Sequence, residues 1–396
     1  MSAGSERNGV QPAKDGSLRI LHCLRAPVGG LFRHVRDLSR EQARRGHCVG
    51  VVCDAAVGDA LTEARLRELE PHLRLGLKRT RMSRELGLSD LSAYLAIRRH
   101  AANLGIDVIH GHGAKGGAYS RLVARSLKRA GAVVASCYTP HGGSLHYHPS
   151  TLQGRIYMHL ERQLAGATDA LIFESAYSAN RYAAQVGRPL CAARIIPNGL
   201  DADDFAEARP AADAADFLFV GELRRLKGVD VLLTALADVR RARPVRAVIV
   251  GGGPDEAAFK AECVQLGLGS AVSFRGAMPA REAFGLGRVL VVPSLAESFP
   301  YIVLEAAAAA LPLLATDVGG IPEIVAGTDT ALLPPQDAVK LALAMLDAIK
   351  DLEAVQARAR RLQEAVARRF TVPAMADGVL DLYAAVSADI PLAAAQ

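Results

Sequence analysis

Short runs of hydrophobic residues alternate with longer amphipathic stretches through the first half of the chain. Residues 18–24 (LRILHCL) predict a buried strand, which the turn APVGG joins to a helix that ends at Gly46. CVGVVCD, DVIHGHG, AVVASCYTP and ALIFES predict further strands, each separated from the next by a helical stretch. Continuous Val, Ile and Ala runs between amphipathic helices are typical of parallel βαβ units in which both faces of the sheet are covered.

The same pattern starts again after residues 197–216, a stretch rich in Pro, Asp and Ala that we interpret as a linker and surface loop. DFLFVGEL, RAVIVGGG, VSFRGA, RVLVVPS and LPLLATD predict the strands of a second sheet. Two doubly wound α/β domains in series fit this repetition better than one large sheet. In such folds ligands bind at the carboxyl ends of the strands, so we expect the ligand in a cleft between the two domains.

We divide the chain into four segments on this basis. Residues 1–17 form a polar tail that we expect to be disordered, 18–195 a first Rossmann-like domain, and 196–372 a second Rossmann-like domain. Residues 373–396 form a C-terminal helix. Pro373 ends one helix and allows this second one, whose destination the sequence does not give.

The length and the charge distribution narrow the class of protein. A chain of 396 residues exceeds what one hydrophobic core usually fills. Residues 1–198 contain 28 Lys and Arg against 15 Asp and Glu, whereas residues 199–396 contain 19 against 26. A basic half can serve nucleic acid, an anionic membrane surface or a polyanionic substrate. No aromatic residues are interleaved with the basic ones and no nucleic-acid-binding motif appears, so we expect no nucleic-acid partner.

Much of the positive charge in the first half lies in Arg65–Leu86, RLRELEPHLRLGLKRTRMSREL. We expect this segment to contact anionic lipid or a lipid-linked ligand, although a solvated helix face is the usual role of such a run. The chain has no stretch of about 18 apolar residues and its start has no apolar signal core. We therefore expect a cytoplasmic location, with the inner face of the cell membrane as a second site.

The stretch ESFPYIVLE places two carboxylates, Glu297 and Glu305, in an otherwise apolar segment. Ser298 is suited to cap a helix that opens at about Phe299, and Pro300 suits its first turn. Eight residues of helix separate the acids by up to about 12 Å, which exceeds the roughly 5 to 9.5 Å of glycosidase acid pairs. The spacing therefore indicates two hydrogen-bond acceptors along a polyhydroxylated ligand. The alternative is that Glu297 favours the helix N-terminus electrostatically and Glu305 is solvated.

The motifs together resemble the retaining glycosyltransferases of the GT-B fold, in particular glycosyltransferase family 4. In the second half they are VGELRRLKGVDVLLTAL, VGGGPDE, FRGAMP and VVPSLAESFPYIVLEAAAAALPLLATDVGGIPE. In the first half they are APVGGLFRHV, DVIHGHGAKGG, YTPHGG, FESAYSANRY and IIPNGLD. The resemblance covers nearly the whole chain, and the E-x7-E, K-G and VGGIPE elements are specific only in combination. It implies two Rossmann-like domains that face each other across a cleft.

The resemblance implies a donor site in the second domain. Glu305 would bind the ribose hydroxyls of a nucleotide sugar, and Glu297 the hydroxyls of the transferred sugar. Lys227 would contact the diphosphate, where negative charge grows as the leaving group departs. The amides of Ser298 and Phe299 would add donors to the phosphates. A surface lysine at a helix start is the plainer interpretation of Lys227.

One residue departs from the family pattern. The family usually has Arg directly after the strand glycine, five residues before the Lys, and this chain has Glu222 there. A carboxylate beside a diphosphate is repulsive unless it turns away. We therefore expect Arg224 or Arg225 to supply the missing cation.

The first domain carries the remaining candidates. Gly29 and Gly30 resemble the glycine loop whose main-chain amides face the donor phosphate or the acceptor, although any tight βα turn needs such residues. His141, in TPHGG, matches the family histidine near the transferred sugar, although a lone histidine at a strand end is more often simply packed or solvated. His112 and Lys115 are weaker candidates for the acceptor side.

The resemblance implies a retaining transfer from a UDP- or GDP-sugar to a hydroxyl of a glycan or lipid-linked acceptor, in bacterial polysaccharide or lipopolysaccharide assembly. It implies front-face attack with a phosphate oxygen as proton acceptor, and neither a metal nor another cofactor. A nucleotide-sugar 2-epimerase with the same fold and a non-catalytic nucleotide-sugar binder are the alternatives. The base, the sugar and the acceptor do not follow from the sequence.

Overall fold

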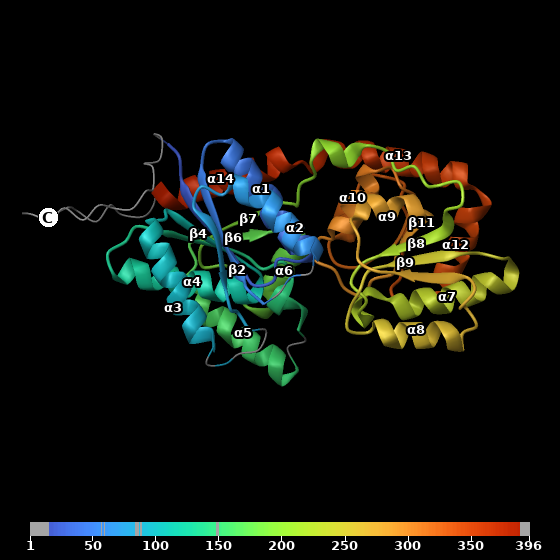
Figure 1. Ribbon diagram of the computed structural model, residues 1–396, viewed down its shortest axis with the longest axis horizontal. Coiled ribbons are helices and arrows are strands. Elements are labelled where there is room, and N and C mark those ends of the chain that lie inside the picture. The colour runs from blue at the N-terminus through green and yellow to red at the C-terminus, as the bar shows by residue number, and fades with distance from the viewer. Residues whose placement is uncertain are drawn as a thin grey trace, which may run out of the picture. The chain divides into compact units, whose positions relative to one another are not determined.

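The computed structural model describes residues 16–388 apart from residues 57, 59, 84–86, 88, 148 and 149. The chain divides into two compact units, each built on its own parallel sheet (Figure 1). Unit 1 comprises Met1–Glu174, Ser178–Pro197 and Val372–Gln396, and unit 2 comprises Ser175–Tyr177 and Asn198–Thr371.

The sheet of unit 1 has seven strands in the order β3-β2-β1-β4-β5-β6-β7. Its strands are β1 (Arg19–Leu24), β2 (Cys48–Asp54), β3 (Gly76–Thr80), β4 (Val108–His112), β5 (Ala135–Thr139), β6 (Ala170–Phe173) and β7 (Ala192–Ile195). The helices that belong to this half of the fold are α1 (Gly29–Arg44), α2 (Ala60–Leu69), η1 (Glu70–His72), α3 (Ser89–Leu104), α4 (Gly113–Arg129), η2 (Gly143–His146), α5 (Leu152–Ala165), α6 (Ala176–Gln185) and α14 (Val372–Ala388).

The strands of unit 1 send alternate side chains to opposite helical layers, as the two-residue period of a strand requires. Leu21 and Cys23 of β1 pack with residues of α3 and α4. Ile20 packs with α1 and α14 on the other face. His22 of β1 lies opposite His110 of β4 in the parallel register. It therefore faces the same layer as Ile20, and three histidines of these two strands end up beneath α1 and α14.

The sheet of unit 2 has six strands in the order β10-β9-β8-β11-β12-β13. Its strands are β8 (Ala215–Val220), β9 (Ala247–Val250), β10 (Val272–Arg275), β11 (Gly287–Val292), β12 (Leu313–Thr316) and β13 (Leu332–Leu333). Its helices are η3 (Ala202–Phe205), η4 (Arg225–Lys227), α7 (Val229–Ala242), α8 (Glu256–Gln265), α9 (Ala280–Ala283), η5 (Phe284–Leu286), α10 (Tyr301–Ala308), α11 (Ile321–Val325), α12 (Ala338–Lys350) and α13 (Leu352–Arg369).

Two apolar clusters cover the two faces of this second sheet. Helices α7, α8 and α12 close one face, and α9, α10, α11 and α13 close the other (Figure 1). In both sheets the strand order reverses once, between β1 and β4 in unit 1 and between β8 and β11 in unit 2. Ligands of doubly wound sheets bind at the carboxyl ends of the strands at such a reversal. The loops that leave these four strands are therefore where the site is expected.

The parallel α/β architecture predicted from the hydrophobic pattern is confirmed, because every strand pair in both sheets is parallel. Each predicted strand corresponds to an observed one, and CVGVVCD is strand β2 without change. Three strands were not predicted, namely β3, β7 and β13. They lie at the sheet edges, where β3 and β7 carry exposed or half-buried residues and β13 has only two residues.

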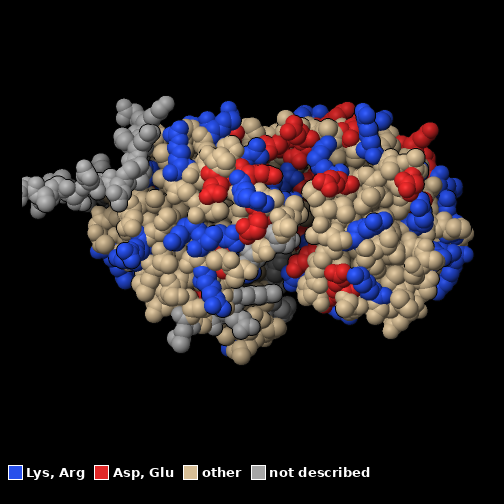
Figure 2. Space-filling view, in the orientation of Figure 1, with Lys and Arg blue, Asp and Glu red and all other residues tan. Residues whose placement is uncertain are grey.

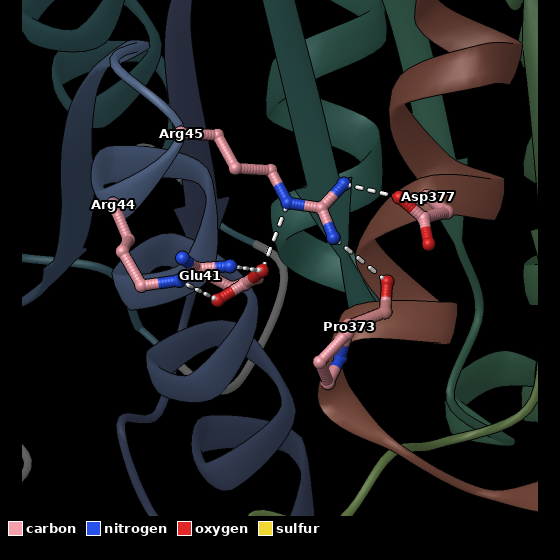
Figure 3. A network of polar contacts seen from close by, with 5 residues as sticks. All are labelled: Glu41, Arg44, Arg45, Pro373 and Asp377. Carbon is pink, nitrogen blue, oxygen red and sulfur yellow. Dashed lines mark hydrogen bonds and ion pairs between the residues drawn. The ribbon is translucent and has the colours of Figure 1, made fainter.

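The C-terminal helix α14 packs in unit 1 against α1 (Figure 3). Arg45 Nη2 donates to the carbonyl oxygen of Pro373 at 3.0 Å, and Arg45 also forms an ion pair with Asp377. Glu41 orients this guanidinium by accepting from Arg45 Nε at 2.8 Å. Hydrogen bonds from Arg44, and then from Arg45, outweigh the effect of burial and lower the pKa of Glu41. The last helix of the chain is therefore part of the first sheet's core.

Two features of the structure, the surface charge and the apolar content of the helices, are relevant to contact with nucleic acid or with a membrane. Figure 2 shows Lys and Arg mixed with Asp and Glu on the visible face of each unit, so this face carries no continuous basic surface among the described residues. No described helix is both long enough and apolar enough to cross a membrane.

Candidate active site

In unit 2, Lys227 and Glu297 lie together at the strand-order reversal. Lys227 ends η4 in the loop after β8, and Glu297 lies in the loop after β11. The Lys227 Nζ is 2.7 Å from Glu297 Oε1, and the side chains are 25% and 8% exposed. The amide of Leu295 donates to the carbonyl oxygen of Leu226 at 2.9 Å, which joins the two loops. Lys227 is therefore a half-buried, paired amine rather than a solvated surface lysine.

Further contacts hold Glu297 in place. Ser294 Oγ donates to Glu297 Oε1 at 2.7 Å, and Thr316 Oγ1 donates to the carbonyl oxygen of Ser294 at 2.6 Å. A Cβ at Gly319 would lie 1.9 Å from the carbonyl oxygen of Glu297, and Gly319 has a φ of +62°. Only glycine fits this position, because of both the contact and the backbone conformation. The VGG motif therefore serves as a close support for the backbone of the acidic loop.

The helix that follows begins later than the sequence analysis expected. Helix α10 starts at Tyr301 with Pro300 as its N-cap and no side-chain cap, so the assignment of Ser298 as the capping residue was wrong. Pro300 has an extended ψ of 124°, which ends the loop rather than opening the first turn. Phe299 is buried, and its carbonyl oxygen accepts from Asn198 Nδ2 at 3.0 Å. Ser298 and Phe299 thus belong to a fixed loop before the helix.

Glu305 lies within α10, as the sequence analysis predicted, and is half-buried. The residues on either side of it, Leu304 and Ala306, are fully buried in the core of unit 2. Glu305 is therefore a carboxylate on a largely buried helix that follows β11.

The structure gives no single replacement for the cation that Glu222 displaces. Arg224 Nη1 lies 3.6 Å from Glu222 Oε2, and Arg225 Nη1 lies 3.5 Å from Asp230 Oδ2. The side chains of Glu222 and Arg225 are 54% and 66% exposed, and that of Arg224 is 42% exposed. The amide of Arg225 donates to Asp255 Oδ2 at 2.8 Å, which anchors the backbone and leaves the guanidinium at the surface. Which arginine acts on a phosphate stays a prediction.

In unit 1, Gly29 and Gly30 open helix α1 immediately after the β1 loop. Gly29 has a φ of +63°, the N-cap Val28 makes no side-chain cap, and the first turn holds no acidic residue. The first amides of a helix have no acceptor within the helix. A sixteen-residue helix with exposed glycines at its start therefore offers amides and the positive end of its dipole to an anion.

His141 follows β5, but its imidazole does not point outward. Its Nδ1 is 2.6 Å from Glu174 Oε1 and its Nε2 is 3.1 Å from His112 Nδ1. The side chain is 7% exposed although the residue as a whole is half-buried, so the main chain carries most of its exposure. The backbone is strained, with a φ of +50° in a residue that is not glycine. Both ring nitrogens are committed within the protein.

His141 is one end of a cluster of buried imidazoles that the sequence analysis did not foresee. Three ring nitrogens of His22, His110 and His112 lie within 4.8 Å of one another, and so do those of His34, His112 and His141. Both nitrogens of His22, His110 and His112 already have hydrogen-bond partners in the protein. The arrangement therefore indicates a hydrogen-bonded chain rather than an ion site.

Burial decides the charge of most of this cluster. It lowers the pKa of His22 to about 4, against a smaller opposing effect of the Gln42 hydrogen bond. Burial, followed by the neighbouring histidines, places the pKa of His110 and His112 well below the usual value. These three imidazoles are therefore neutral at pH 7. A motif such as I-H-G-H, with histidines two residues apart on one strand face, is the sequence signal that indicates such a cluster.

Lys115, a weaker candidate for the acceptor side, is engaged elsewhere. Its Nζ lies 2.5 Å from Asp90 Oδ1, and the same oxygen accepts from the Tyr119 hydroxyl. The glycine that follows Lys115 has a structural reason, because a Cβ at Gly116 would lie 2.3 Å from the carbonyl oxygen of Cys23. The AKGG motif thus places α4 close to β1.

A buried ion pair that the sequence analysis missed supports the turn after His141. Arg121 Nη1 donates to Glu161 Oε2 at 2.8 Å, and the two side chains are 1% and 4% exposed. Glu161 Oε1 accepts from the Tyr138 hydroxyl at 2.9 Å and from Ser144 Oγ at 2.8 Å. The guanidinium lies 4.0 Å from the centre of the Tyr138 ring. Both oxygens of the carboxylate are satisfied, and Ser144 is fixed in η2.

Two known families match successive parts of the chain. Residues 28–204 match the family described as Glycosyltransferase Family 4, and residues 214–351 match the family described as Glycosyl transferases group 1. The chain belongs to the group 1 glycosyltransferases of family 4, and its two units form a GT-B fold.

Individual relatives cover most of the chain. It is 28% identical over 386 residues to "Glycogen synthase" of Mycobacterium tuberculosis, an alignment that spans 90% of this chain and 91% of the relative. Sucrose-phosphate synthase from Thermosynechococcus elongatus superposes with a TM-score of 0.77 at 22% identity, over 94% of this chain and all of that one. Anabaena Alr3699/HepE in complex with UDP-glucose superposes with a TM-score of 0.77 at 20% identity, over 93% of this chain and all of that one.

Proposed function

We propose that this glycosyltransferase moves a sugar, with retention at the anomeric carbon, from a nucleoside diphosphate sugar to a hydroxyl of a glycan or a lipid-linked acceptor. The observation that carries the proposal is the Lys227–Glu297 pair at the strand-order reversal of unit 2. The amine of Lys227 is half-buried and paired with the carboxylate of Glu297. When the donor binds, the amine exchanges this partner for the diphosphate. Anabaena Alr3699/HepE, which shares the fold, forms a complex with UDP-glucose, and this supports a nucleotide sugar as the donor class.

Each residue of unit 2 then has a distinct task. The amine of Lys227 stabilises the charge that develops on the departing diphosphate, which is the largest electrostatic demand of the reaction. Glu297, fixed by Ser294 and by the Gly319 loop, accepts from hydroxyls of the transferred sugar. Glu305 accepts from the ribose hydroxyls, and the amides of Ser298 and Phe299 donate to phosphate oxygens.

In unit 1 the amides at Gly29 and Gly30 bind an anionic or polar group of the substrates, and His141 acts through the turn that it anchors. The acceptor hydroxyl attacks on the face from which the diphosphate leaves, and a phosphate oxygen takes its proton. Charge stabilisation and positioning supply the catalysis, and no step uses a metal or another cofactor.

A donor screen followed by product analysis tests this function. Thermal unfolding is measured with UDP, GDP, UDP-glucose and a GDP-sugar, and the donor that stabilises the protein most is then followed by proton NMR with a panel of glycan acceptors. We expect an α-linked product from an α-configured donor. A β-linked product contradicts retention. Conversion of the donor to an epimer without acceptor indicates an epimerase, and binding without hydrolysis or transfer indicates a non-catalytic binder.

We also propose that the basic segment 65–83 contacts an anionic membrane surface that holds a lipid-linked acceptor. Residues 84–86, the end of the segment named in the sequence analysis, lie outside the described residues. Arg74, Lys78 and Arg81 are exposed around the edge strand β3. Basic side chains near an anionic bilayer contribute about 1 kcal/mol each.

Cosedimentation with vesicles that contain phosphatidylglycerol tests this contact. Reversal of Arg74, Lys78 and Arg81 to Glu should reduce the bound fraction, whereas reversal of two exposed arginines of unit 2, Arg241 and Arg243, should leave it unchanged. If both charge-reversed variants bind the vesicles equally well, segment 65–83 does not contact the membrane.

A further inference from the structure

A hydrogen-bonded chain of five buried side chains runs through unit 1 from helix α1 to the end of β6. Gln42 Oε1 lies 2.8 Å from His22 Nε2, and His22 Nδ1 lies 2.9 Å from His112 Nε2. His112 Nδ1 lies 3.1 Å from His141 Nε2, and His141 Nδ1 lies 2.6 Å from Glu174 Oε1. Gln42, His22, His112 and Glu174 are at most 2% exposed. Solvent therefore does not complete any link of the chain.

The amide oxygen at one end sets the direction of the whole chain. An amide oxygen only accepts, so His22 Nε2 carries a hydrogen and a neutral His22 presents a lone pair at Nδ1. His112 must then donate from Nε2 and present its own lone pair at Nδ1. By the same rule His141 donates from Nε2. Each of the three imidazoles thus donates from Nε2, and His22 and His112 accept at Nδ1.

The last link requires one more proton. His141 Nδ1 and Glu174 Oε1 are 2.6 Å apart, which is a hydrogen-bond distance only if a proton lies between them. The three imidazoles and the carboxyl group then hold four protons, and the chain as a whole is neutral. With three protons a buried negative charge would remain and two lone pairs would face each other. Because an imidazole is more basic than a carboxylate, the fourth proton resides on His141.

We propose that Gln42 and Glu174 are positioning residues that hold His141 as an imidazolium and thereby fix the turn at the end of β5. The two ends of the chain act together: Gln42 sets the direction of the hydrogen bonds, and Glu174 retains the additional proton. His22 and His112, whose burial keeps them neutral, transmit the orientation between them.

Two other imidazoles pack against the chain. His110 of β4 lies 4.0 Å from the His112 ring, and its two nitrogens contact the hydroxyls of Tyr383 on α14 and Thr139 on β5. His34 of α1 packs edge-on against His141 at 4.8 Å between ring centres. Among these described neighbours Glu174 is the carboxylate in contact with a ring nitrogen of the chain.

The inward-turned imidazole of His141 affects the backbone of the turn at residues 141–143. His141, Gly142 and Gly143 have φ values of +50°, +73° and +21°, a succession that a free chain would abandon. Two hydrogen bonds to the inward-turned imidazole hold the strained residue, so its main chain stays at the strand end. This role of the turn rests on the proposed function, whereas the proton count does not.

Nitrogen-resolved NMR of the imidazoles in the ligand-free protein tests the proton count. Near pH 7 we expect His22 and His112 as single tautomers protonated at Nε2, and His141 protonated at both nitrogens. Tautomers protonated at Nδ1 in His22 and His112 would show that the amide of Gln42 is reversed and would overturn the proposal. A neutral His141 at this pH would overturn it as well. No substrate enters this measurement, so its result is independent of the proposed function.

The Glu174→Gln variant tests the retained proton. Its amide group can donate to His141 Nδ1, so the chain keeps its direction with one proton fewer and His141 becomes a neutral imidazole protonated at Nε2. In the wild type, stability should fall as the pH rises through the range in which NMR shows loss of the His141 proton, because the folded state binds that proton. Glu174→Gln should show no such fall.

The exposed Glu68 of α2 provides the matched control, since Glu68→Gln makes the same chemical change outside the chain. Its stability should follow the pH dependence of the wild type. Equal pH dependence of the wild type and Glu174→Gln would overturn the proposal. UDP binding, measured separately in the three proteins, reports on the proposed function and not on the chain.

Discussion

The candidate residues of the two units use charge in opposite ways. In unit 2 the Lys227 side chain is 25% exposed, so its amine can turn from the buried Glu297 to a ligand. In unit 1 the histidine of the TPHGG motif is turned inward, and its ring nitrogens are committed to His112 and Glu174. We therefore expect Lys227 and Glu297 to act through their side chains and His141 to fix a backbone. A family motif therefore does not by itself say which part of a residue faces the substrate.

The two units also differ in where the contacts that hold their candidate residues lie. The turn of unit 1 depends on Glu161, which binds Arg121, Tyr138 and Ser144 in the interior. The acidic loop of unit 2 depends on a glycine contact and on Ser294, close to the site itself. Substitutions in the first set should therefore act mainly on stability, whereas substitutions in the second set should also affect donor binding.

The largest effect is expected from Arg121→Met. The change leaves the carboxylate of Glu161 buried without its cation, and breaking such a pair costs about 3–5 kcal/mol. Urea unfolding measures the loss. The double variant Arg121→Met, Glu161→Leu removes both charges and should recover part of the stability. If the single variant unfolds like the wild type, the buried support of the turn is of no energetic importance.

Lys227→Ala should lower the transfer rate by about 10²–10³-fold, the effect of removing one group that stabilises developing charge. Stability should fall by less than in Arg121→Met, because the Lys227 side chain is 25% exposed whereas that of Arg121 is 1% exposed. Steady-state kinetics with the donor found in the screen measures the rate. Lys260→Ala serves as control, since Lys260 also pairs with a glutamate but on the exposed helix α8. If Lys227→Ala and Lys260→Ala have similar transfer rates, Lys227 does not take part in the reaction.

Gly319→Ala should cost about 1–3 kcal/mol of stability, because its φ is positive and its Cβ would meet the carbonyl oxygen of Glu297 at 1.9 Å. Gly327→Ala is the matched control. Gly327 also has a positive φ, +80°, but a Cβ there would have nothing within 4 Å. Urea unfolding should show the greater loss for Gly319→Ala, and only that variant should weaken donor binding. Equal losses would mean that the contact with Glu297 is unimportant.

The smallest effect is expected from Asp377→Asn, which removes the ion pair between α14 and Arg45. The aspartate is 63% exposed, and pairs at such exposure contribute about 0–1 kcal/mol. Arg45 keeps its bonds to Glu41 and to the Pro373 carbonyl oxygen. Thermal unfolding measures the change. A loss several times larger would mean that this pair, rather than the apolar face of α14, holds the last helix in unit 1.

Parts of the fold were predictable because they depend on local periodicity. Continuous apolar runs gave the buried strands of both sheets, and their alternation with helices gave the parallel order. The edge strands β3 and β7 escaped prediction because their residues are exposed or half-buried, so the hydrophobic pattern that identifies a strand is absent. The sequence analysis placed the start of α10 at Phe299, whereas the helix begins at Tyr301. A proline is compatible with both the first helical turn and the N-cap position. Only the ψ angle of Pro300 shows that it is the N-cap.

The sequence by itself determined the fold class and the family, and it named the residue types at the carboxyl ends of the strands. Only the tertiary structure decided what those residues do. The register of β1 with β4 places His22 opposite His110, and the packing of α1 brings Gln42 to His22. Such contacts join residues distant along the chain through a shared sheet face. No local pattern contains that information, because it arises from how strands and helices pack.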